Sequence, residues 1–298
     1  MAHLVNKEKG IYRAVEGKMT NKMKNILSID TESWIHFYED ALKIKKFTSA
    51  ERKRLDRGYV KKAIQSLLTL LERYNQKATF FIVAEIYEWY PEAIEEIRKR
   101  GHEIAYHTHT HPLLKNADIL ERELFLSREF IRKFRPRGFR APQIYLTEDA
   151  MPLLERYGFT YSSSSYDEYI IEKHGSIKEI PVSTMPLKKS AFSKNLPKQL
   201  SLKMLFSKIP IGSGLFVALF GPMTSRFITK INRSGSPAIL FIHPWQLYQT
   251  QEIMSPRFRL NLFLKNPLCL PYTINVTRTM EKIFKAHKFT SFRDYFDG

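Results

Sequence analysis

The chain has 298 residues, of which 43% are hydrophobic and 26% are charged, so it can bury the core of one large domain without needing a second. Its formal net charge at pH 7 is +18. The single cysteine, Cys269, excludes an internal disulfide and a cysteine-based zinc site. Any transition metal in this chain must therefore be bound by His, Asp or Glu.

The N-terminal segment is polar, and we predict a flexible tail over 1–24 followed by a single domain over 25–298. The segment lacks the apolar core of a secretory signal. No stretch of the chain is long enough and apolar enough to span a bilayer. These features predict an intracellular, cytoplasmic protein.

Short apolar runs alternate with helical patterns along the chain, at intervals of about 30 residues. The predicted strands are 25–30, 77–84, 102–106, 138–140, 159–161, 179–182 and 237–243. The predicted helices are 59–74, 91–101, 118–134, 147–158 and 275–287. This alternation predicts parallel βαβ units, and therefore an α/β barrel or a doubly wound sheet.

Polar residues lie at the ends of several of these predicted strands: Asp30, His107, Arg140 and His243. In α/β barrels the functional residues lie at the carboxyl ends of the strands. This placement favours the barrel, with a functional site at that rim.

The stretch 183–236 interrupts the alternation, and we interpret it as a long basic insertion bordering the site. Between Glu179 and Glu281 there are thirteen Lys and Arg residues and one acid, Glu252, which gives a local charge of 13 − 1 = +12. Such a run is either a solvated basic face or a surface for an anionic polymer, phospholipid head group or diphosphate-linked substrate. Nucleic acid is not predicted as a partner, because no helix-turn-helix, zinc finger or aromatic RNA-binding signature is present.

Three histidines, His107, His109 and His111, alternate with threonines directly after a predicted strand. Imidazole is the commonest protein ligand for transition metals, so the cluster predicts a metal site that uses at least two of them. Pro112 disfavours a helical conformation for His111. If the run is extended, all three side chains share a face, whereas a turn would bring His107 and His111 together and direct His109 away.

Two carboxylates, Asp30 and Glu32, are two positions apart and would lie on the same face of an extended segment. One could bind metal while the other acts as a base. Arg140 lies in a Gly-Phe-Arg-Ala-Pro turn and could orient a carboxylate. His243 ends an apolar strand and is a candidate general acid.

Taken together, these motifs resemble the polysaccharide deacetylases of the NodB-homology family, carbohydrate esterase family 4, over roughly residues 25 to 296. The resemblance is closest to the branch found with bacterial exopolysaccharide and exosortase loci. The motifs, in order along the chain, are Leu27 to Trp34, Ala78 to Phe81, Gly101 to His111, Gly138 to Pro142, Gly158 to Ser164 and Phe241 to Trp245.

The resemblance implies a distorted (β/α)7 barrel of the NodB type that holds a divalent metal, usually Zn²⁺, and removes N-acetyl groups from amino sugars in a polysaccharide or lipid-linked glycan. It further implies the role of each site residue: Asp30 as general base, His243 as general acid, Arg140 orienting Asp30, and Glu32, His107 and His111 as metal ligands. Trp245 and Tyr145 could provide a wall against which a sugar ring stacks.

The sequence departs from the family pattern in the fourth motif, where Ser162 occupies the position of an acid that usually pairs with the catalytic histidine. Asp167 or Glu168 could replace that acid. The metal-binding carboxylate is Glu32 rather than the commoner Asp, and His109 is left out of the ligand set. Two other functions remain open: hydrolysis of a different non-peptide C–N amide bond, and a catalytically weak carbohydrate-binding protein.

Overall fold

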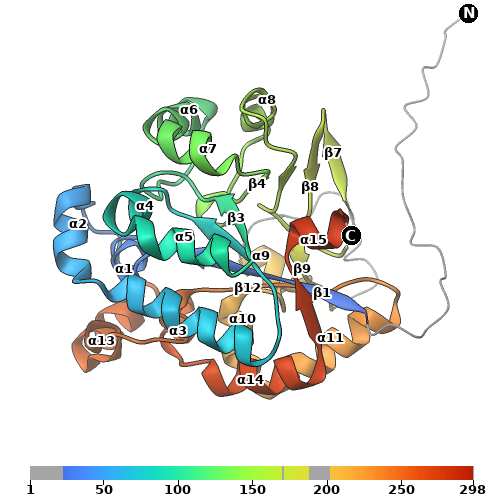
Figure 1. The fold of residues 1–298 in the computed structure, drawn as a ribbon. Coiled ribbons are helices and arrows are strands. Elements are labelled where there is room, and N and C mark those ends of the chain that lie inside the picture. The colour runs from blue at the N-terminus through green and yellow to red at the C-terminus, as the bar shows by residue number, and fades with distance from the viewer. Residues whose placement is uncertain (1–22, 170, 188–201, 298) are drawn as a thin grey trace, which may run out of the picture.

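The structure is a computed structural model, and it describes residues 23–169, 171–187 and 202–297. At its centre a curled sheet is formed by strands in the order β12-β1-β2-β3-β4-β5-β8-β7. The bounds of these strands are Ile239–Ile242, Lys24–Thr31, Thr79–Ile82, Glu103–Tyr106, Gly138–Phe139, Tyr161–Ser162, Ile177–Glu179 and Glu172–His174. Every pair along this order is parallel except β7 with β8, and the helices lie outside the sheet (Figure 1). The predicted distorted barrel is therefore confirmed.

The register of the strands brings their carboxyl ends to one level. Thr31 pairs with Ile82, Ile82 with Tyr106, and Tyr106 with Phe139. On the other side of β1, Ile29 pairs with Ile242. Because each candidate side chain lies at or just after these positions, the register alone gathers them at one rim of the barrel.

The outer helices follow the predicted periodicity. Their bounds are α3 Tyr59–Arg73, α5 Pro91–Lys99, α6 Ala117–Leu126, α7 Arg128–Phe134, α8 Met151–Arg156 and α14 Thr277–Ala286. A further outer helix, α11 Thr224–Arg233, lies within the predicted insertion and was not predicted. In α3 the apolar stripe of Val60, Ile64, Leu67 and Leu71 is buried, as expected for an amphipathic helix packed on a sheet. The predicted helix over 118–134 is interrupted at Ser127, whose hydroxyl contacts Tyr106 and His109.

Several elements were not predicted. They include α1 Trp34–Leu42, α2 Ser49–Asp56, α4 Glu85–Trp89, α12 Gln251–Met254, α13 Pro256–Lys265, α15 Phe292–Phe296, the 3-10 helix η6 Pro267–Thr273 and β13 Lys288–Thr290. Strand β13 pairs with the beginning of β1, in parallel. Most of these elements have nine residues or fewer, so their residue patterns carry little periodicity.

The open side of the sheet, between β8 and β12, is bridged through Gly212. The amide of Gly212 donates to the carbonyl of Ser183, and its carbonyl accepts from the amide of Phe241. Ser183 belongs to β9, Val182–Ser183, which also pairs with β6, Tyr166–Asp167. A Cβ atom at position 212 would lie 2.2 Å from the carbonyl oxygen of Ile239, so this close approach requires glycine.

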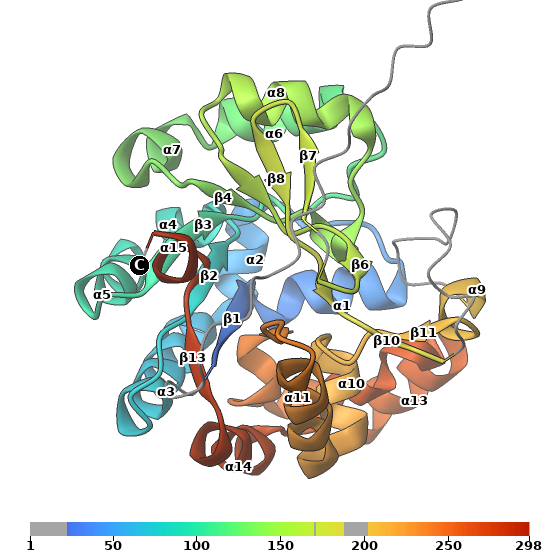
Figure 2. The same ribbon diagram turned by 90° about the vertical axis from the view of Figure 1, so that its right-hand side faces the viewer.

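The described part of the predicted insertion contains β10 Met185–Pro186, α9 Leu202–Leu205, β11 Lys208–Ile209 and α10 Gly214–Phe220. Strands β10 and β11 form an antiparallel pair (Figure 2). The apolar stretch of the insertion, in α10, contributes the buried side chains of Leu215 and Val217 to the domain interior. Residues 1–22 of the predicted tail and 188–201 of the insertion lie outside the described residues. In the described part of the chain, no helix has the length and apolarity needed to cross a membrane.

Candidate active site

Asp30, Glu32, His107, Arg140 and His243 are all buried at the carboxyl-terminal rim of the sheet. Asp30 is the penultimate residue of β1, and Glu32 directly follows that strand. His107 follows β3, Arg140 follows β4 and His243 follows β12. The structure thus brings the sequence-predicted base, ligands and acid together from segments far apart in the sequence.

Glu32, His107 and His111 form a compact cluster of possible metal ligands. Each offers one ligand atom, and these atoms lie within 4.8 Å of one another. The rings of His107 and His111 are 4.9 Å apart, and Oε2 of Glu32 is buried without a hydrogen-bond partner. This oxygen lies 3.4 Å from Nε2 of His111. A buried carboxylate oxygen without a hydrogen bond beside two imidazoles is costly unless a cation binds there, so this donor set fits a divalent metal.

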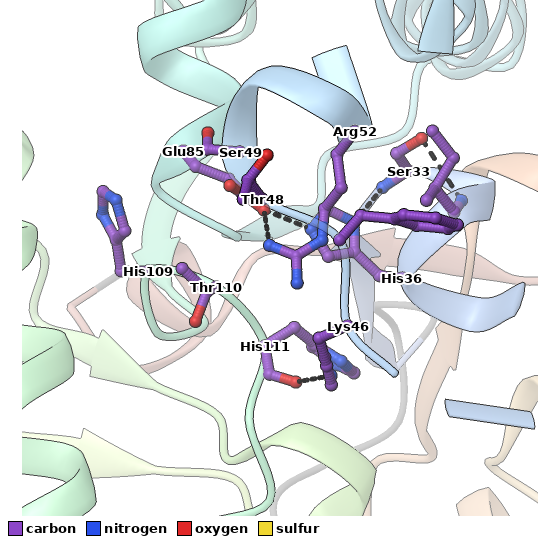
Figure 3. Close-up of polar contacts among 12 residues, drawn as sticks. Ser33, His36, Lys46, Thr48, Ser49, Arg52, Glu85, His109, Thr110 and His111 are labelled. Atoms are coloured by element: carbon purple, nitrogen blue, oxygen red, sulfur yellow. Dashed lines mark hydrogen bonds and ion pairs between the residues drawn. The ribbon is translucent and has the colours of Figure 1, made fainter. Parts of the chain in front are cut away.

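The histidine run turns, which resolves the alternative left open by the sequence. Thr108 and His111 both have positive φ angles, 63° and 60°, and the amide of His111 donates to the hydroxyl of Thr108. This turn brings His111 back beside His107. His109 points away from His111 (Figure 3), with its Nδ1 3.2 Å from the hydroxyl of Ser127.

Each ligand histidine is oriented by a hydrogen bond from its other ring nitrogen. Nδ1 of His107 donates to the carbonyl of Arg140 at 2.7 Å, and Nδ1 of His111 donates to Asp40 at 2.9 Å. The Nε2 lone pair of each ring is therefore the one available to a metal. Lys46 forms an ion pair with Asp40 at 2.7 Å and also donates to the carbonyl of His111 (Figure 3).

The two ligand histidines differ in their proton affinity. Burial, helped by the neighbouring His111, lowers the pKa of His107 to about 4, although the carboxylate of Asp30 acts in the opposite direction. Burial also opposes protonation of His111, but the carboxylates of Glu32 and Asp40 outweigh it and raise its pKa. In the metal-free protein, a cation therefore meets a neutral His107 and competes with a proton at His111.

Two carboxylates, Glu32 in the cluster and Asp40 beside it, are ionised. Burial alone would raise the pKa of Glu32, but His111 and His243 lower it to about 2. Burial likewise opposes ionisation of Asp40, yet His111 and Lys46 hold its pKa well below its usual range. Both groups are thus negative at neutral pH and ready to balance a bound cation.

Arg140 holds Asp30 in place and is itself held on every side. Its Nη1 donates to Asp30 at 2.8 Å and to the hydroxyl of Ser28, while its Nε and Nη2 donate to the carbonyl and hydroxyl of Ser163. The guanidinium is 0% exposed and lies 4.3 Å from the centroid of the Phe81 ring. This arginine is fixed before any substrate binds, so it presents Asp30 in one orientation.

His243 lies between a carboxylate at Nε2 and a neutral amide at Nδ1. Its Nε2 lies 3.3 Å from Glu32, and its Nδ1 lies 3.3 Å from Oε1 of Gln246. Nε2 of Gln246 donates to the carbonyl of Gly214, which fixes the amide so that its oxygen faces the histidine.

Neither expected substitute for the missing acid is the one that pairs with His243. Asp167 forms an ion pair with Lys208 at 2.9 Å, and the amide of Glu168 donates to Asp167. Ser162 bonds instead to the hydroxyl of Ser164. The proposal of Asp167 or Glu168 is corrected: the partner is Gln246, which stands three positions after His243.

The two residues predicted to stack against a sugar differ in exposure. Trp245 is 1% exposed, and its ring stacks on His243 at 4.3 Å and on Phe37 at 5.1 Å. It packs behind the histidine and has no open face for a sugar, so its predicted stacking role is not supported in this structure. Tyr145 is half-buried, and its sugar contact stays a prediction.

A buried polar network missed by the sequence analysis lies beside the metal cluster. Nε2 of His36 is 2.6 Å from Glu85, and Arg52 forms ion pairs with both Glu85 and Glu39. The ring of His36 is 6.0 Å from that of His111 (Figure 3). Burial opposes ionisation of Glu85, but His36 and Arg52 lower its pKa to about 2. The network joins α1, α2 and α4 behind the cluster.

Comparison with known proteins supports a polysaccharide deacetylase domain. A family model described as polysaccharide deacetylase matches residues 54–162, a range that contains His107, His111 and Arg140. A peptidoglycan deacetylase-like protein of Gibberella zeae is 36% identical over 106 residues, which are 33% of this chain and 31% of that protein. A peptidoglycan-N-acetylglucosamine deacetylase of Bacillus cereus is 28% identical over 106 residues, which are 34% of this chain and 38% of that protein.

The fold is also similar to that of solved structures. A structure from Mycobacterium smegmatis described as a polysaccharide deacetylase has a TM-score of 0.51 and 17% identity, and covers 95% of this chain and 97% of that one. The likeness at this identity concerns the fold alone. The chain thus shares the deacetylase fold along nearly its whole length, while its matches to the two curated relatives span about a third of it.

Proposed function

We propose that this protein is a metal-dependent hydrolase that removes the N-acetyl group from an amino-sugar unit of a polysaccharide or lipid-linked glycan. One observation carries the proposal: several groups meet at one rim of the barrel. They are the Asp30–Arg140 pair, His243, and the cluster of Glu32, His107 and His111. The names of the matched relatives, which are peptidoglycan deacetylases, support the same reaction.

Glu32, His107 and His111 would hold the divalent cation. Two imidazoles and one carboxylate are a ligand set typical of catalytic zinc, so Zn²⁺ is the cation we propose. When bound there, such an ion lowers the pKa of water and polarises an amide carbonyl. Asp40 and the carbonyl of Arg140 fix the two imidazoles so that both Nε2 atoms face the site.

The remaining residues move protons. Asp30, oriented by Arg140, accepts a proton from the water that adds to the acetamide carbonyl carbon. The C–N bond then breaks, and His243 donates a proton to the departing nitrogen. The products are acetate and a free amine on the sugar. The burial of Asp30 and His243 excludes bulk water from both proton transfers.

The nature of the glycan is also part of the proposal. The strongly basic stretch between Glu179 and Glu281 supports contact with an anionic, membrane-associated or lipid-linked substrate. Membership of the exopolysaccharide branch and a cytoplasmic location at the inner membrane stay predictions from the sequence.

The test is release of acetate from N-acetylglucosamine oligomers by the purified, zinc-loaded protein. We expect Asp30→Asn to lower the rate about 100-fold to 10,000-fold, because the general base is lost. Its metal content should stay that of the wild type, since Asp30 is not in the ligand cluster.

No acetate from any N-acetylated sugar would contradict the proposal. Turnover of other amides by the wild type would instead identify a different C–N hydrolase. Bound metal without turnover of any amide would identify a carbohydrate-binding protein.

A further inference from the structure

The outer face of α13 is apolar and exposed. This helix buries Phe258 and Leu262, which are one turn apart, against the domain. Its exposed apolar side chains are Leu260 at 58%, Phe263 at 57% and Leu264 at 70%. At about 100° per residue, these three lie on the side of the helix opposite the buried pair.

Two further exposed side chains extend this face. Met254, in α12, and Leu268, in η6, flank α13 in the sequence and are about half exposed. We define the α13 patch as Met254, Leu260, Phe263, Leu264 and Leu268. Exposed side chains of this size scattered singly are ordinary, but five within fifteen residues mark an interaction surface.

The stretch of sequence that contains the α13 patch is basic, although Glu252 directly precedes it. Between Ile253 and Met280 the sequence contains Arg257, Arg259, Lys265 and Arg278 and no acidic residue. Arg257 and Arg259 lie on either side of the apolar stripe of the helix. None of the four cations forms an ion pair among the described residues, and only Arg259 donates a side-chain hydrogen bond there, to the carbonyl of Thr273. Their charges are therefore not neutralised within the described structure.

We propose that the α13 patch docks on an anionic lipid bilayer, with α13 lying in the plane of the interface. A helix with Leu and Phe on its outer face and Arg or Lys at the flanks is the type that inserts shallowly among anionic head groups. With ten residues, α13 is about 15 Å long, which is too short to span a bilayer and sufficient to lie in its surface.

Charge favours a bilayer over a second copy of this chain. In a two-fold dimer the same patch meets itself, so the cations of one copy would face the identical cations of the other. An anionic membrane satisfies both parts of the surface, because acyl chains accept the apolar side chains and phosphates accept the cations.

The buried face of α13 is linked to the acid side of the active site through a series of packed aromatic rings. Phe258 stacks on Tyr38 and packs edge-on against Phe37, which in turn stacks on Trp245. Tyr272, at the end of η6, packs edge-on against His243 at 5.1 Å. Docking would therefore hold the site close to the membrane surface, where a lipid-linked glycan is presented. This last consequence rests on the proposed function, whereas docking itself does not.

The experiment measures co-sedimentation of the full-length protein with phosphatidylcholine vesicles, with and without phosphatidylglycerol, in the absence of any glycan. We expect binding only to the anionic vesicles, and weakening with added salt. The triple variant Leu260→Ser/Phe263→Ser/Leu264→Ser should bind at least about tenfold more weakly. Arg257→Gln/Arg259→Gln should weaken binding by about fivefold per cation removed.

Matched controls change the same residue types on α6 and α7, at the far end of the molecule (Figure 1, Figure 2). Phe125→Ser and Arg128→Gln/Arg132→Gln should bind vesicles as the wild type does. Asp30→Asn should also bind normally, which separates docking from catalysis. Equal circular dichroism spectra and Tm values would show that each variant is folded.

Three outcomes would overturn the proposal. The first is no binding of the wild type to anionic vesicles. The second is equal loss of binding in the α7 charge variant, which would show that net charge alone attracts the protein. The third is a wild type that dimerises without vesicles while the triple Ser variant stays monomeric. This would assign the α13 patch to a second copy of the chain.

Discussion

On the metal-binding side of the site, the Nδ1 atom of His111 is oriented by a carboxylate, whereas beside β12 the Nδ1 atom of His243 is oriented by a neutral amide. His111 donates to Asp40, which is paired with Lys46. His243 instead meets the amide oxygen of Gln246 and the face of Trp245. The two sides therefore differ in the charge of the group that contacts Nδ1 of the histidine.

This difference fits the separate tasks that we propose for the two sides. A cation site gains affinity from ligands whose second nitrogen is bonded to a carboxylate or carbonyl. A general acid must give its proton away, and a neutral partner opposes this less than a carboxylate does. A substitution on one side should therefore leave the task of the other side unchanged.

The largest effect should come from the ligand histidines themselves. Replacing His107 or His111 with Ala removes one of three ligands, so we expect metal binding and acetate release to be lost. His109→Ala is the matched control, because the ring of His109 faces Ser127 and not the cluster.

The control variant should keep its metal and lose about 1 kcal/mol of stability with the lost hydrogen bond. Metal content is measured by elemental analysis, and stability by urea unfolding. Loss of metal in His109→Ala would contradict the two-histidine assignment.

A smaller effect is expected at Asp40. In Asp40→Asn the charge that stabilises His111 is lost, while the amide oxygen can still accept its Nδ1 proton. We expect the Kd for zinc to rise about 10-fold to 100-fold, with the acetate release rate recovering at saturating metal.

Gln143→Ala tests whether any disturbance of Asp40 has the same result. Gln143 is exposed, and it contacts Asp40 only through a long 3.4 Å hydrogen bond. Its zinc Kd should stay near that of the wild type. An unchanged Kd in Asp40→Asn would show that the carboxylate is not needed to orient His111.

Sequence patterns predicted the parts of the structure that depend on strand ends. Asp30 and His243 follow long apolar runs, and parallel pairing places such ends at one rim. Pro112 disfavoured a helix at His111 and left an extended run and a turn both open, and the observed turn depends on positive φ angles at Thr108 and His111. Two non-glycine residues in that conformation could not be predicted from residue type.

The partners that orient the site were harder to predict. Asp40 stands 71 residues before His111 and reaches it only because α1 packs across the rim. Gln246 is only three residues from His243, but a neutral amide does not match the acid that the resemblance predicts as the partner of this histidine. Trp245 followed an apolar strand, a pattern equally consistent with a substrate wall and with core packing. In each case the deciding contact comes from tertiary packing rather than local pattern.

The smallest effect, and the most direct probe of the contrast between the two sides, is expected from Gln246→Glu. A carboxylate beside Nδ1 favours the imidazolium of His243, so the alkaline limb of the acetate-release profile should move to higher pH by about one unit or less. The variant also loses the donor to the carbonyl of Gly214, which should cost about 1 kcal/mol of stability.

Gln246→Ala separates charge from orientation, because it removes the contact with His243 without adding a carboxylate. We expect its rate to fall at every pH while the alkaline limb stays in place. Zinc affinity should be unchanged in both variants, since Gln246 contacts no ligand of the cluster. If the alkaline limb of Gln246→Glu coincides with that of the wild type, proton donation by His243 does not control the rate, and the division of tasks between the two sides is wrong.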